Sequence, residues 1–374
     1  MQIATGTAGI IGLSPVSLLS GTFSENRQAS ESAHSDIPMR TLGKTGLEFT
    51  QLGFGAMRTS DPAVIRRGVE MGINNIDTAR GYMDGENERI VAKALAGVRE
   101  KVHITTKIKH GTPQQMRGDL EESLKALDTD YIDVLLRHSM KRPEDLEDEE
   151  TRKFLEEAKA SGKARFIGFS THRRMASLLR AAGDDEFYDV VLTAFNFTHG
   201  EDLVNAVNYA AEKGIGIIAM KTQAGGYEEE ATKNLNPHQT ALKWVLSNNS
   251  VTSAIPSMVT FQQLEENHSV LDSKFGWLDR KTLDKYGHAI DEKLCRFCGA
   301  CEDICPFGVP VSDLNRCVMY VDGYRDSDLA ARAYREISSG NNARQCLECD
   351  ECVVQCINGV NVARNMKRAT ELFT

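Results

Sequence analysis

Residues 101–138 read KVHITTKIKHGTPQQMRGDLEESLKALDTDYIDVLLRH and contain one strand–helix–strand unit. The first strand is expected at Val102–Ile108 and the second at Ile132–Leu136, because both runs are short, apolar and rich in β-branched residues. Between them, residues 113–127 are expected to form an amphipathic helix. Its apolar side chains recur at three- and four-residue spacing, at Met116, Leu120, Leu124 and Leu127.

The same alternation occurs eight times between about residues 48 and 271. Strands are expected at 49–57, 74–79, 102–108, 132–136, 164–169, 190–195, 216–220 and 252–256. Helices are expected at 61–72, 86–97, 113–127, 147–161, 173–182, 201–213, 237–248 and 260–271. Asp61 and Pro62 begin the first helix as N-cap and N1, and Gly162, Gly183 and Gly214 are expected to end three later helices. Eight units predict a parallel (β/α)8 barrel, since a doubly wound sheet usually has fewer units and a Gly-rich turn after its first strand.

Composition and charge narrow the class of protein. The chain of 374 residues is 41% hydrophobic and 26% charged, which is typical of a globular protein of two to three domains. The net charge is −9, so we expect no nucleic-acid partner. All nine cysteines lie at or beyond Cys295. A disulfide-stapled secreted protein would spread its cysteines through the fold, so this distribution indicates a cysteine-free domain followed by a cysteine-rich module.

The N-terminal segment has a different composition. Residues 1–24 contain no charged side chain, and a polar stretch follows to Pro38. The apolar part is too short and too interrupted for a transmembrane helix, and we expect no membrane span. Two interpretations of residues 1–37 stay open: the remnant of a twin-arginine-like export signal that has lost its basic part, or an N-terminal extension. The first places the protein in the periplasm and the second in the cytoplasm.

Four titratable residues follow neighbouring strands of the predicted barrel. Asp77 ends the second strand, Tyr82 lies in the loop after it, Lys107 ends the third strand and His138 ends the fourth. Each one alone is better explained as a structural residue. Together they lie at the C-terminal ends of strands, where barrel enzymes build their active sites, and they predict a catalytic site.

A single chemistry accounts for the four residues. A carbonyl group that receives hydride needs a proton on its developing alkoxide. A phenol supplies that proton if a neighbouring ammonium lowers its pKa from about 10. A carboxylate holds the ammonium in place, and an imidazole donates to the carbonyl oxygen and orients it.

These residues and several motifs around them resemble the aldo/keto reductase family. The similarity covers about residues 39–272. Its motifs are Asp77-Thr78-Ala79 with Tyr82, Lys107, IDVLLRH (132–138), LGKTGL (42–47), LGFGAM (52–57), GKARFIGFS (162–170), and Ile255-Pro256 with Glu266-Asn267. The resemblance implies a barrel that binds a nicotinamide nucleotide without a Rossmann motif. It also implies that Tyr82 is the general acid, that Lys107 and Asp77 tune it, and that His138 positions a small carbonyl or alcohol substrate.

The resemblance further implies which residues bind the nucleotide. These are Gly55, Met57, Ser170, Thr171, Met220, Lys221, Ser257, Gln263 and Asn267. The chain departs from the family at several nucleotide-binding positions. Thr171 stands in place of an asparagine, and Leu192 stands in place of a glutamine that binds the nicotinamide amide in many members. Ser257 and Gln263 stand where many members place the Lys and Arg that bind the 2′-phosphate. Because charge-assisted bonds to that phosphate contribute about 1.5–3 kcal/mol each, the choice between NADP and NAD stays open.

The cysteine-rich module contains two runs with identical spacing. They are Cys295-x2-Cys298-x2-Cys301-x3-Cys305-Pro306 and Cys346-x2-Cys349-x2-Cys352-x3-Cys356. This spacing is typical of 4Fe-4S clusters. A zinc site needs only two Cys-x2-Cys pairs, and eight cysteines so close in sequence could hardly reach disulfide geometry.

In the two-cluster ferredoxin pattern the fourth cysteine of each run binds the other cluster. The pattern assigns cluster one to Cys295, Cys298, Cys301 and Cys356. It assigns cluster two to Cys346, Cys349, Cys352 and Cys305. Cys317 remains and is interpreted as a buried apolar residue. A helical stretch near 326–338 makes the module resemble the mostly α-helical dicluster ferredoxins, so we expect a barrel domain at 38–285 and a ferredoxin-like domain at 286–374.

Three hypotheses connect the two halves. Nicotinamide transfers two electrons as hydride and each cluster transfers one, and no flavin motif is present to convert between them. In the favoured hypothesis the barrel interconverts a carbonyl and an alcohol, and the clusters serve a redox partner protein or complete the fold. In the second the barrel is idle and the chain is an electron-transfer or partner-docking subunit. In the third the clusters are purely structural. The intact tetrad argues for the first.

Overall fold

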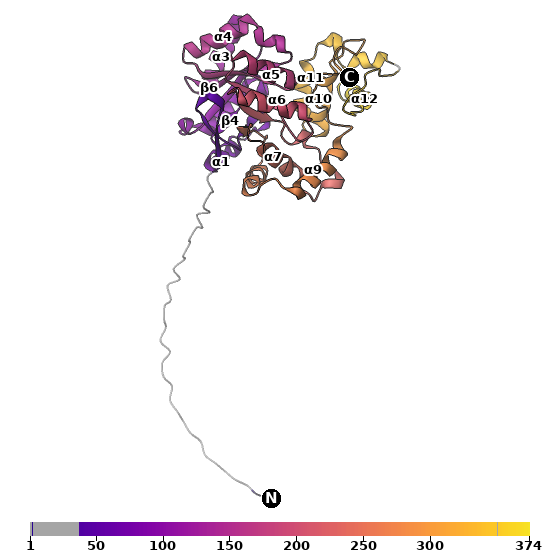
Figure 1. Ribbon diagram of the computed structural model, residues 1–374, viewed down its shortest axis with the longest axis horizontal. Coiled ribbons are helices and arrows are strands. Elements are labelled where there is room, and N and C mark those ends of the chain that lie inside the picture. The colour runs from indigo at the N-terminus through magenta and orange to yellow at the C-terminus, as the bar shows by residue number, and fades with distance from the viewer. Residues whose placement is uncertain (1, 3–36, 350) are drawn as a thin grey trace. The chain divides into compact units, whose positions relative to one another are not determined.

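The computed structural model describes Gln2, residues 37–349 and residues 351–374 (Figure 1). The predictions for the N-terminal segment therefore fall on residues that lie almost wholly outside the described part. The strands are β1 (Met39–Thr41), β2 (Glu48–Thr50), β3 (Phe54–Gly55), β4 (Asn75–Asp77), β5 (His103–Ile108), β6 (Ile132–Met140), β7 (Ala164–Thr171), β8 (Val190–Ala194), β9 (Gly216–Met220) and β10 (Ser253–Ala254).

Strands β3 to β10 form one parallel sheet in the order β10-β9-β8-β7-β6-β5-β4-β3. Parallel bridges from Leu52 to Ala254 and from Gly55 to Ser257 join its two edges. The sheet therefore closes on itself, and the predicted (β/α)8 barrel is confirmed.

The predicted first strand, at 49–57, is wrong in extent. Its first part, β2, pairs antiparallel with β1 outside the barrel, and only Phe54–Gly55 joins the eight-stranded sheet. The physical reason is burial, because Leu42, Leu47 and Phe49 of this hairpin pack against apolar side chains of the barrel interior. The amide of Lys44 donates to the Gly214 carbonyl just before β9 (2.8 Å), so the hairpin closes the N-terminal end of the barrel.

The helices follow the predicted alternation closely. They are α1 (Pro62–Glu70), α2 (Glu86–Leu95), α3 (Pro113–Leu127), α4 (Glu149–Ala160), α5 (Met175–Asp185), α6 (Glu201–Glu212), α7 (Pro237–Leu246), α8 (Phe261–His268), α9 (Trp277–Ile290), α10 (Val311–Asp322), α11 (Ser327–Arg335) and α12 (Val362–Phe373). Short 3-10 helices lie at Gly43–Thr45, Ala56–Arg58, Tyr82–Gly85, Arg99–Lys101, Pro143–Glu147, Ala224–Gly226, Glu230–Thr232, Ser269–Asp272, Ser339–Asn341 and Ala343–Glu348.

Most of the predicted helix ends are confirmed, with one exception. The Asp61 carboxylate accepts from the Ala63 amide (2.8 Å) as the N-cap of α1, and Gly162 and Gly214 have the left-handed φ of a C-cap, +75° and +85°. Gly183 is not a cap but lies inside α5. A Cβ there would lie 2.9 Å from Cε1 of Tyr209, so glycine is needed for close packing of α5 on α6.

The C-terminal part is mostly helical, as predicted. Helix α9 crosses the expected boundary at 285–286. A small apolar core gathers side chains of α10 and α12 around five cysteines. Other residues of α10 and α11, including Cys317, Met319 and Ala333, belong to the main core of the barrel. Cys317 is buried, as predicted. Residues 37–349 and 351–374 thus belong to one compact unit, and its described helices include none that is long and apolar enough to span a bilayer.

Replacing Gly168 by alanine is expected to destabilise the barrel. A Cβ at this position of β7 would lie 1.9 Å from the Val190 carbonyl oxygen, which is backbone and cannot move aside cheaply. We expect a loss of about 3 kcal/mol or more and a lower anaerobic unfolding midpoint. Gly118→Ala is the matched control, since a Cβ there meets nothing within 4 Å and alanine favours the helix by about 0.5–1 kcal/mol. Equal midpoints for the two variants would contradict this account.

Candidate active site

A buried ion pair lies at the C-terminal end of the barrel. Asp77 ends β4 and Lys107 lies in the neighbouring β5. The Lys107 ammonium donates to both Asp77 carboxylate oxygens (2.6 and 2.8 Å) and to the Thr78 carbonyl (2.6 Å). All three of its protons therefore have acceptors. The side chain of Lys107 is only 1% exposed, and a buried charge of this kind persists because it is paired.

Tyr82 and His138 complete the predicted group of four. The phenol ring of Tyr82 lies over the Lys107 ammonium, with 4.9 Å between the nitrogen and the ring centroid. The imidazole of His138, on β6, meets the same ring edge to face with 5.8 Å between centroids. The structure therefore brings together all four residues, which the sequence places at the ends of three neighbouring strands.

The phenol of Tyr82 is held in its protonated form. Burial raises its pKa well above the usual 10, and the negative charge of Asp77 raises it further, while Arg316 opposes the shift. The net shift of this pKa is therefore upward, whereas the sequence predicted a lowered value. Burial is the largest cause, and it outweighs the effect of Lys107, whose charge is paired with Asp77 at 2.6 Å.

The imidazole of His138 is neutral at ordinary pH. Burial lowers its pKa well below 6.5, and the positive charges of Lys107, Lys109, Arg316 and Arg137 lower it further. Its Nδ1 atom is buried and has no hydrogen-bond partner among the described residues. A neutral imidazole offers one donor and one acceptor, so it can donate a single hydrogen bond to an oxygen placed beside Tyr82.

One cavity beside the tetrad, of about 370 Å³, brings together most of the predicted nucleotide-binding residues. Those that line it are Gly55, Met57, Met220, Lys221, Ser257, Gln263 and Asn267. Ser170 lines a neighbouring cavity instead and accepts from the Ser139 amide (2.9 Å). Thr171 lines neither cavity, because its hydroxyl lies inside the protein, 2.9 Å from each of the carbonyl oxygens of Met140 and Arg173, and donates its one proton to this pair. Leu192 lies in the barrel interior. We call the cavity of 370 Å³ the nucleotide groove.

Sequence reasoning missed several residues of the nucleotide groove. Gln223 donates to the Asn267 side chain (2.8 Å). Arg58 donates to the Tyr324 carbonyl (2.8 Å), and its guanidinium lies 4.9 Å from the Tyr324 ring centroid. The position of Arg58, directly after Met57, was a signal in the sequence. Tyr324 belongs to the turn between α10 and α11, and no local pattern could have placed it there.

The neighbouring cavity, of about 700 Å³, is shared by the barrel and the tail. Tyr82, Lys107 and His138 line one side, and Arg316 and Tyr320 of α10 line another. We call it the tetrad cavity. Tyr82 also lines the nucleotide groove, as do Met57, Met220 and Lys221. The tyrosine therefore lies where the two cavities meet, which is where a hydride donor and a proton donor would have to meet.

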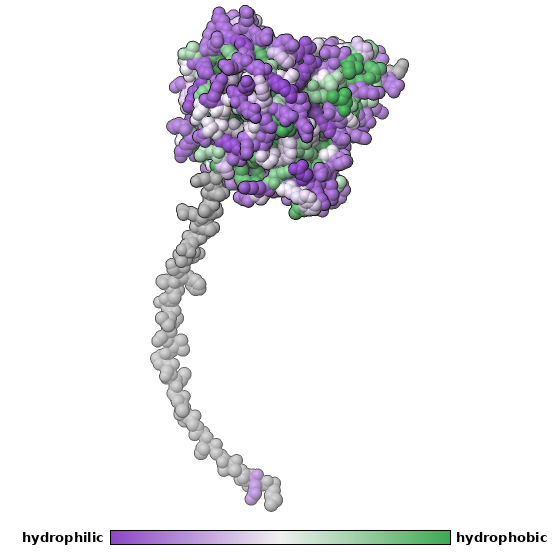
Figure 2. Space-filling view, viewed as in Figure 1, coloured by the Kyte–Doolittle hydropathy of each residue, from purple (hydrophilic) through white to green (hydrophobic). Residues whose placement is uncertain are grey.

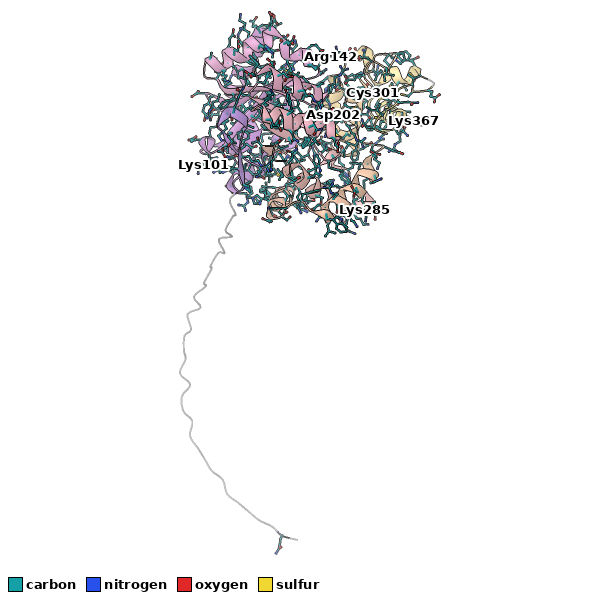
Figure 3. All side chains as sticks on the ribbon, in the orientation of Figure 1. Lys101, Arg142, Asp202, Lys285, Cys301 and Lys367 are labelled. Carbon is teal, nitrogen blue, oxygen red and sulfur yellow. The ribbon has the colours of Figure 1, made fainter. Side chains whose placement is uncertain are left out.

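The eight cysteines of the two runs gather in two groups. Burial raises the pKa of the Cys295 thiol to about 12, and the nearby thiols that raise it further are those of Cys301, Cys298 and Cys356. Burial likewise raises the pKa of Cys346 to about 11, and its neighbours are Cys305, Cys349 and Cys352. In each group one cysteine comes from the other run. Figure 3 labels Cys301 in the C-terminal part.

Amide groups approach the sulfur atoms of the first group. The amides of Phe297 and Asn358 donate to the sulfurs of Cys295 and Cys356, and the Asn358 side chain donates to Cys298 (all 3.4 Å). Thiols that receive such amide bonds suit a cluster of sulfur-bound iron, whose potential depends on such bonds. In the described part of the chain, no three His, Cys, Asp or Glu side chains are arranged to hold a single metal ion.

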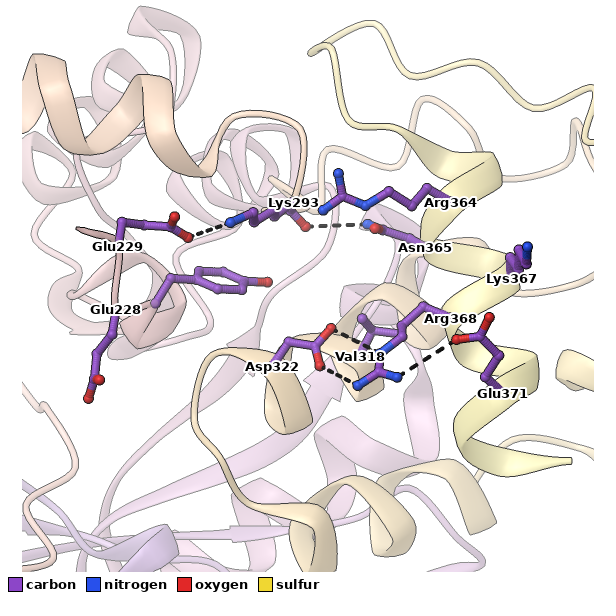
Figure 4. Close-up of a pocket in the computed structure, with 11 residues that line it drawn as sticks. Glu228, Glu229, Lys293, Val318, Asp322, Arg364, Asn365, Lys367, Arg368 and Glu371 are labelled. Atoms are coloured by element: carbon purple, nitrogen blue, oxygen red, sulfur yellow. Dashed lines mark hydrogen bonds and ion pairs between the residues drawn. The ribbon is translucent and has the colours of Figure 1, made fainter. Parts of the chain in front are cut away.

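A further groove, of about 490 Å³, lies away from the tetrad and contains none of the predicted residues (Figure 4). Its walls are α10, α12 and the segment at 227–229. Lys293 pairs with Glu229 (2.6 Å) and Arg368 with Asp322 (3.0 Å). These charges largely satisfy one another, so we assign it no ligand.

A parallel barrel with a buried lysine–aspartate pair, a protonated tyrosine and a neutral histidine at its strand ends defines an NAD(P)-dependent oxidoreductase. The model described as "Aldo/keto reductase family" matches residues 51–240, which are just over half of the chain. The chain therefore belongs to the aldo/keto reductase family. A second model, "4Fe-4S binding domain", matches residues 288–311, so the tail carries an iron–sulfur binding domain.

Relatives of known activity and structure agree with this assignment. Methylglyoxal reductase YeaE of Escherichia coli (strain K12) is 28% identical over 247 residues, covering 62% of this chain and 85% of that protein. Methylglyoxal reductase DkgB of Escherichia coli O157:H7 is 30% identical over 249 residues, covering 62% and 90%. An aldo-keto reductase from Klebsiella pneumoniae, solved in complex with NADPH, has the same fold, with a TM-score of 0.57 at 22% identity over 67% of this chain and 95% of that one.

Proposed function

We propose that the barrel interconverts a small carbonyl compound and its alcohol with NADP or NAD, and that Tyr82 is the proton donor for reduction. One observation carries the proposal. A protonated, partly buried phenol lies over the Lys107–Asp77 pair at the junction of the nucleotide groove and the tetrad cavity. The two methylglyoxal reductases among the relatives favour a small aldehyde or ketone as substrate.

The residues have separate tasks in this proposal. A bound nicotinamide supplies hydride to the carbonyl carbon. Tyr82 gives its phenolic proton to the carbonyl oxygen, and the Lys107 ammonium below the ring stabilises the phenolate that remains. Asp77 holds Lys107 in position through two hydrogen bonds. His138 donates to the same oxygen and orients the substrate.

This chain lacks the two cations that many family members place at the phosphate-binding positions, but other cations line its nucleotide groove. Ser257 and Gln263 are uncharged, while Arg58, Lys221 and Arg325 line the groove. Arg58 is already paired with Asp326 (3.2 Å). Anaerobic titration with NADPH and with NADH, followed by difference spectra, measures the preference. Tighter binding of NADPH would show that these cations replace the missing pair.

The pH dependence of reduction follows from the two pKa shifts. Tyr82 acts in its protonated form, and its pKa is raised above 10, so activity is lost only as the pH rises through that raised value. His138 has a pKa well below 6.5 and stays neutral above it. We expect kcat/KM for reduction to be level between about pH 6.5 and 10. A decline with a midpoint between about pH 7 and 9 would contradict the assignment of Tyr82, provided that nucleotide affinity, measured in parallel, does not change.

We further propose that the tail holds two 4Fe-4S clusters, one in each cysteine group. Each cluster would supply single-electron transfer when bound. The cross-run neighbours of Cys295 and Cys346 support the crossed set of ligands. Anaerobic purification with iron and sulfide analysis and EPR tests the count, with about eight iron atoms per chain expected. About four would leave one group without a cluster.

A second function is favoured by the surface of the tail. Several large apolar side chains within or beside the cysteine runs are exposed, namely Ile304, Phe307, Leu347, Val353 and Ile357. Figure 2 shows a hydrophobic area over this part of the chain. Exposed apolar patches commonly mark protein interfaces, and a redox partner protein could exchange electrons with the clusters there. If titration shows no nicotinamide binding, the chain is an electron-transfer or docking subunit and the barrel is not an active reductase.

A further inference from the structure

The tetrad cavity is cationic although the chain as a whole is acidic. Its walls carry eight Lys or Arg side chains and three Asp or Glu side chains, in a chain of net charge −9. Two of the three acids are already engaged. Glu336 pairs with Lys109 (2.6 Å), and Asp313 pairs with both Arg173 and Arg316. Lys107 is paired with Asp77. Five cations of the wall then face a single further acid, Asp84, so the cavity favours an anionic guest.

Arg316 is the most buried of these cations that faces the tetrad from the tail. Its side chain is 14% exposed. One terminal nitrogen donates to Nε2 of His172 (2.7 Å), and the other lies 3.2 Å from an Asp313 oxygen. Its Nε atom is buried and has no hydrogen-bond partner among the described residues. The two terminal nitrogens carry four N–H groups, and His172 and Asp313 engage one on each. Two N–H groups are therefore left for an anion in the cavity.

The guanidinium of Arg316 lies close to Tyr82 and His138. Its charge lowers the pKa values of both Tyr82 and His138 through space, so the guanidinium lies near both. It lines the tetrad cavity but not the nucleotide groove. An anion bound to it would therefore belong to the substrate rather than to the phosphates of the nucleotide.

We propose that Arg316 binds the carboxylate of the substrate, so that the barrel acts on small oxo acids rather than on neutral carbonyl compounds. The inference rests on the proposed function and adds the substrate class. A guanidinium presents a planar set of N–H donors that matches a carboxylate and binds it more strongly than a neutral group. Because Arg316 belongs to α10, the iron–sulfur tail would select the substrate of the barrel.

The test compares two substrates, one of which carries a carboxylate and the other its uncharged methyl ester. The full chain, loaded with iron under anaerobic conditions, is assayed with 4-carboxybenzaldehyde and with its methyl ester. We expect the wild type to prefer the acid. We expect Arg316→Gln to lower kcat/KM for the acid about 10- to 100-fold, mainly through KM, and to lower the value for the ester much less. Arg316→Lys should restore part of the loss, because it restores the charge without the planar donors.

Two controls separate this role from a structural one. Arg364→Gln makes the same charge change on α12, outside the tetrad cavity. It should leave kcat/KM unchanged for both the acid and the ester. Iron content and the unfolding midpoint show whether each variant is folded. Binding of 4-(hydroxymethyl)benzoate, measured by calorimetry without nucleotide, reports on the anion site apart from catalysis and should be lost in Arg316→Gln.

The outcomes distinguish the inference from the proposed function. Equal rates for acid and ester in the wild type, or an equal loss for both in Arg316→Gln, would overturn the inference while carbonyl reduction stands. If neither compound is reduced, the proposed function fails and calorimetry decides the inference. Binding of 4-(hydroxymethyl)benzoate that depends on Arg316 would then support an anion site. If this compound did not bind to the wild type, the inference would be overturned.

Discussion

Replacing Tyr82 by phenylalanine is expected to lower kcat/KM for carbonyl reduction by about 10²- to 10⁴-fold, which is the usual contribution of a positioned general acid. The change removes one oxygen and leaves the ring over Lys107, so the buried Lys107–Asp77 pair should persist. Nucleotide binding and iron content are expected to stay at wild-type values. Steady-state assays, nucleotide titration and iron analysis on the same anaerobic sample measure all three.

Tyr209→Phe is the matched control for this substitution. Tyr209 lies on α6, where its hydroxyl bonds to Asp184, so the same oxygen is removed far from the tetrad. Its activity should equal that of the wild type. If Tyr82→Phe kept the greater part of the activity, another group or a water molecule would be the proton donor, and the role assigned to Tyr82 would be wrong.

Replacing Cys356 by alanine is expected to remove one cluster and to spare the other. Cys356 belongs to the second run in sequence, but its thiol lies with Cys295, Cys298 and Cys301. The variant should therefore lose about half of its iron and one of two EPR signals. Because three thiolates hold such a cluster poorly, the tail around the first group should also become less stable. Cys317→Ala, which alters a buried cysteine outside both runs, should keep both signals.

Pairs of variants test whether the ligands cross between the runs. Cys356→Ala and Cys295→Ala should abolish the same EPR signal. Cys305→Ala and Cys346→Ala should abolish the other. If Cys356→Ala and Cys346→Ala removed the same signal, each run would bind its own cluster and the crossed assignment would be refuted.

The barrel itself was predictable because its signals are local. Helix α3 spans the residues that its apolar spacing predicts, 113–127, since both the period and the Pro113 start are written in consecutive residues. The errors occurred where packing between distant segments decides the outcome. The first strand is short because residues 42–49 pack into the end of the barrel. Gly183 lies within α5 because the ring of Tyr209 on the next helix fills the space beside it.

The convergence of the tetrad and the grouping of the cysteines were also predictable from the sequence. Parallel strands place their C-terminal ends at one edge, so Asp77, Lys107 and His138 had to converge once the barrel was assumed. The direction in which the pKa of Tyr82 is shifted could not be predicted from the sequence. Its direction depends on how completely the charge of Lys107 is neutralised and how deeply the phenol is buried.

Some features of this protein are therefore determined by local residue spacing, and others by contacts between distant segments. Residue spacing was enough for the barrel, the positions of its four polar residues and the two cysteine runs, because periodicity and ligand spacing act over a few residues. The cationic side chains that the tail contributes to the wall of the tetrad cavity are placed there by contacts between residues far apart in the chain. Arg316 reaches His172 across 144 positions of sequence, and only the packing of α10 onto the barrel brings its charge close to Tyr82.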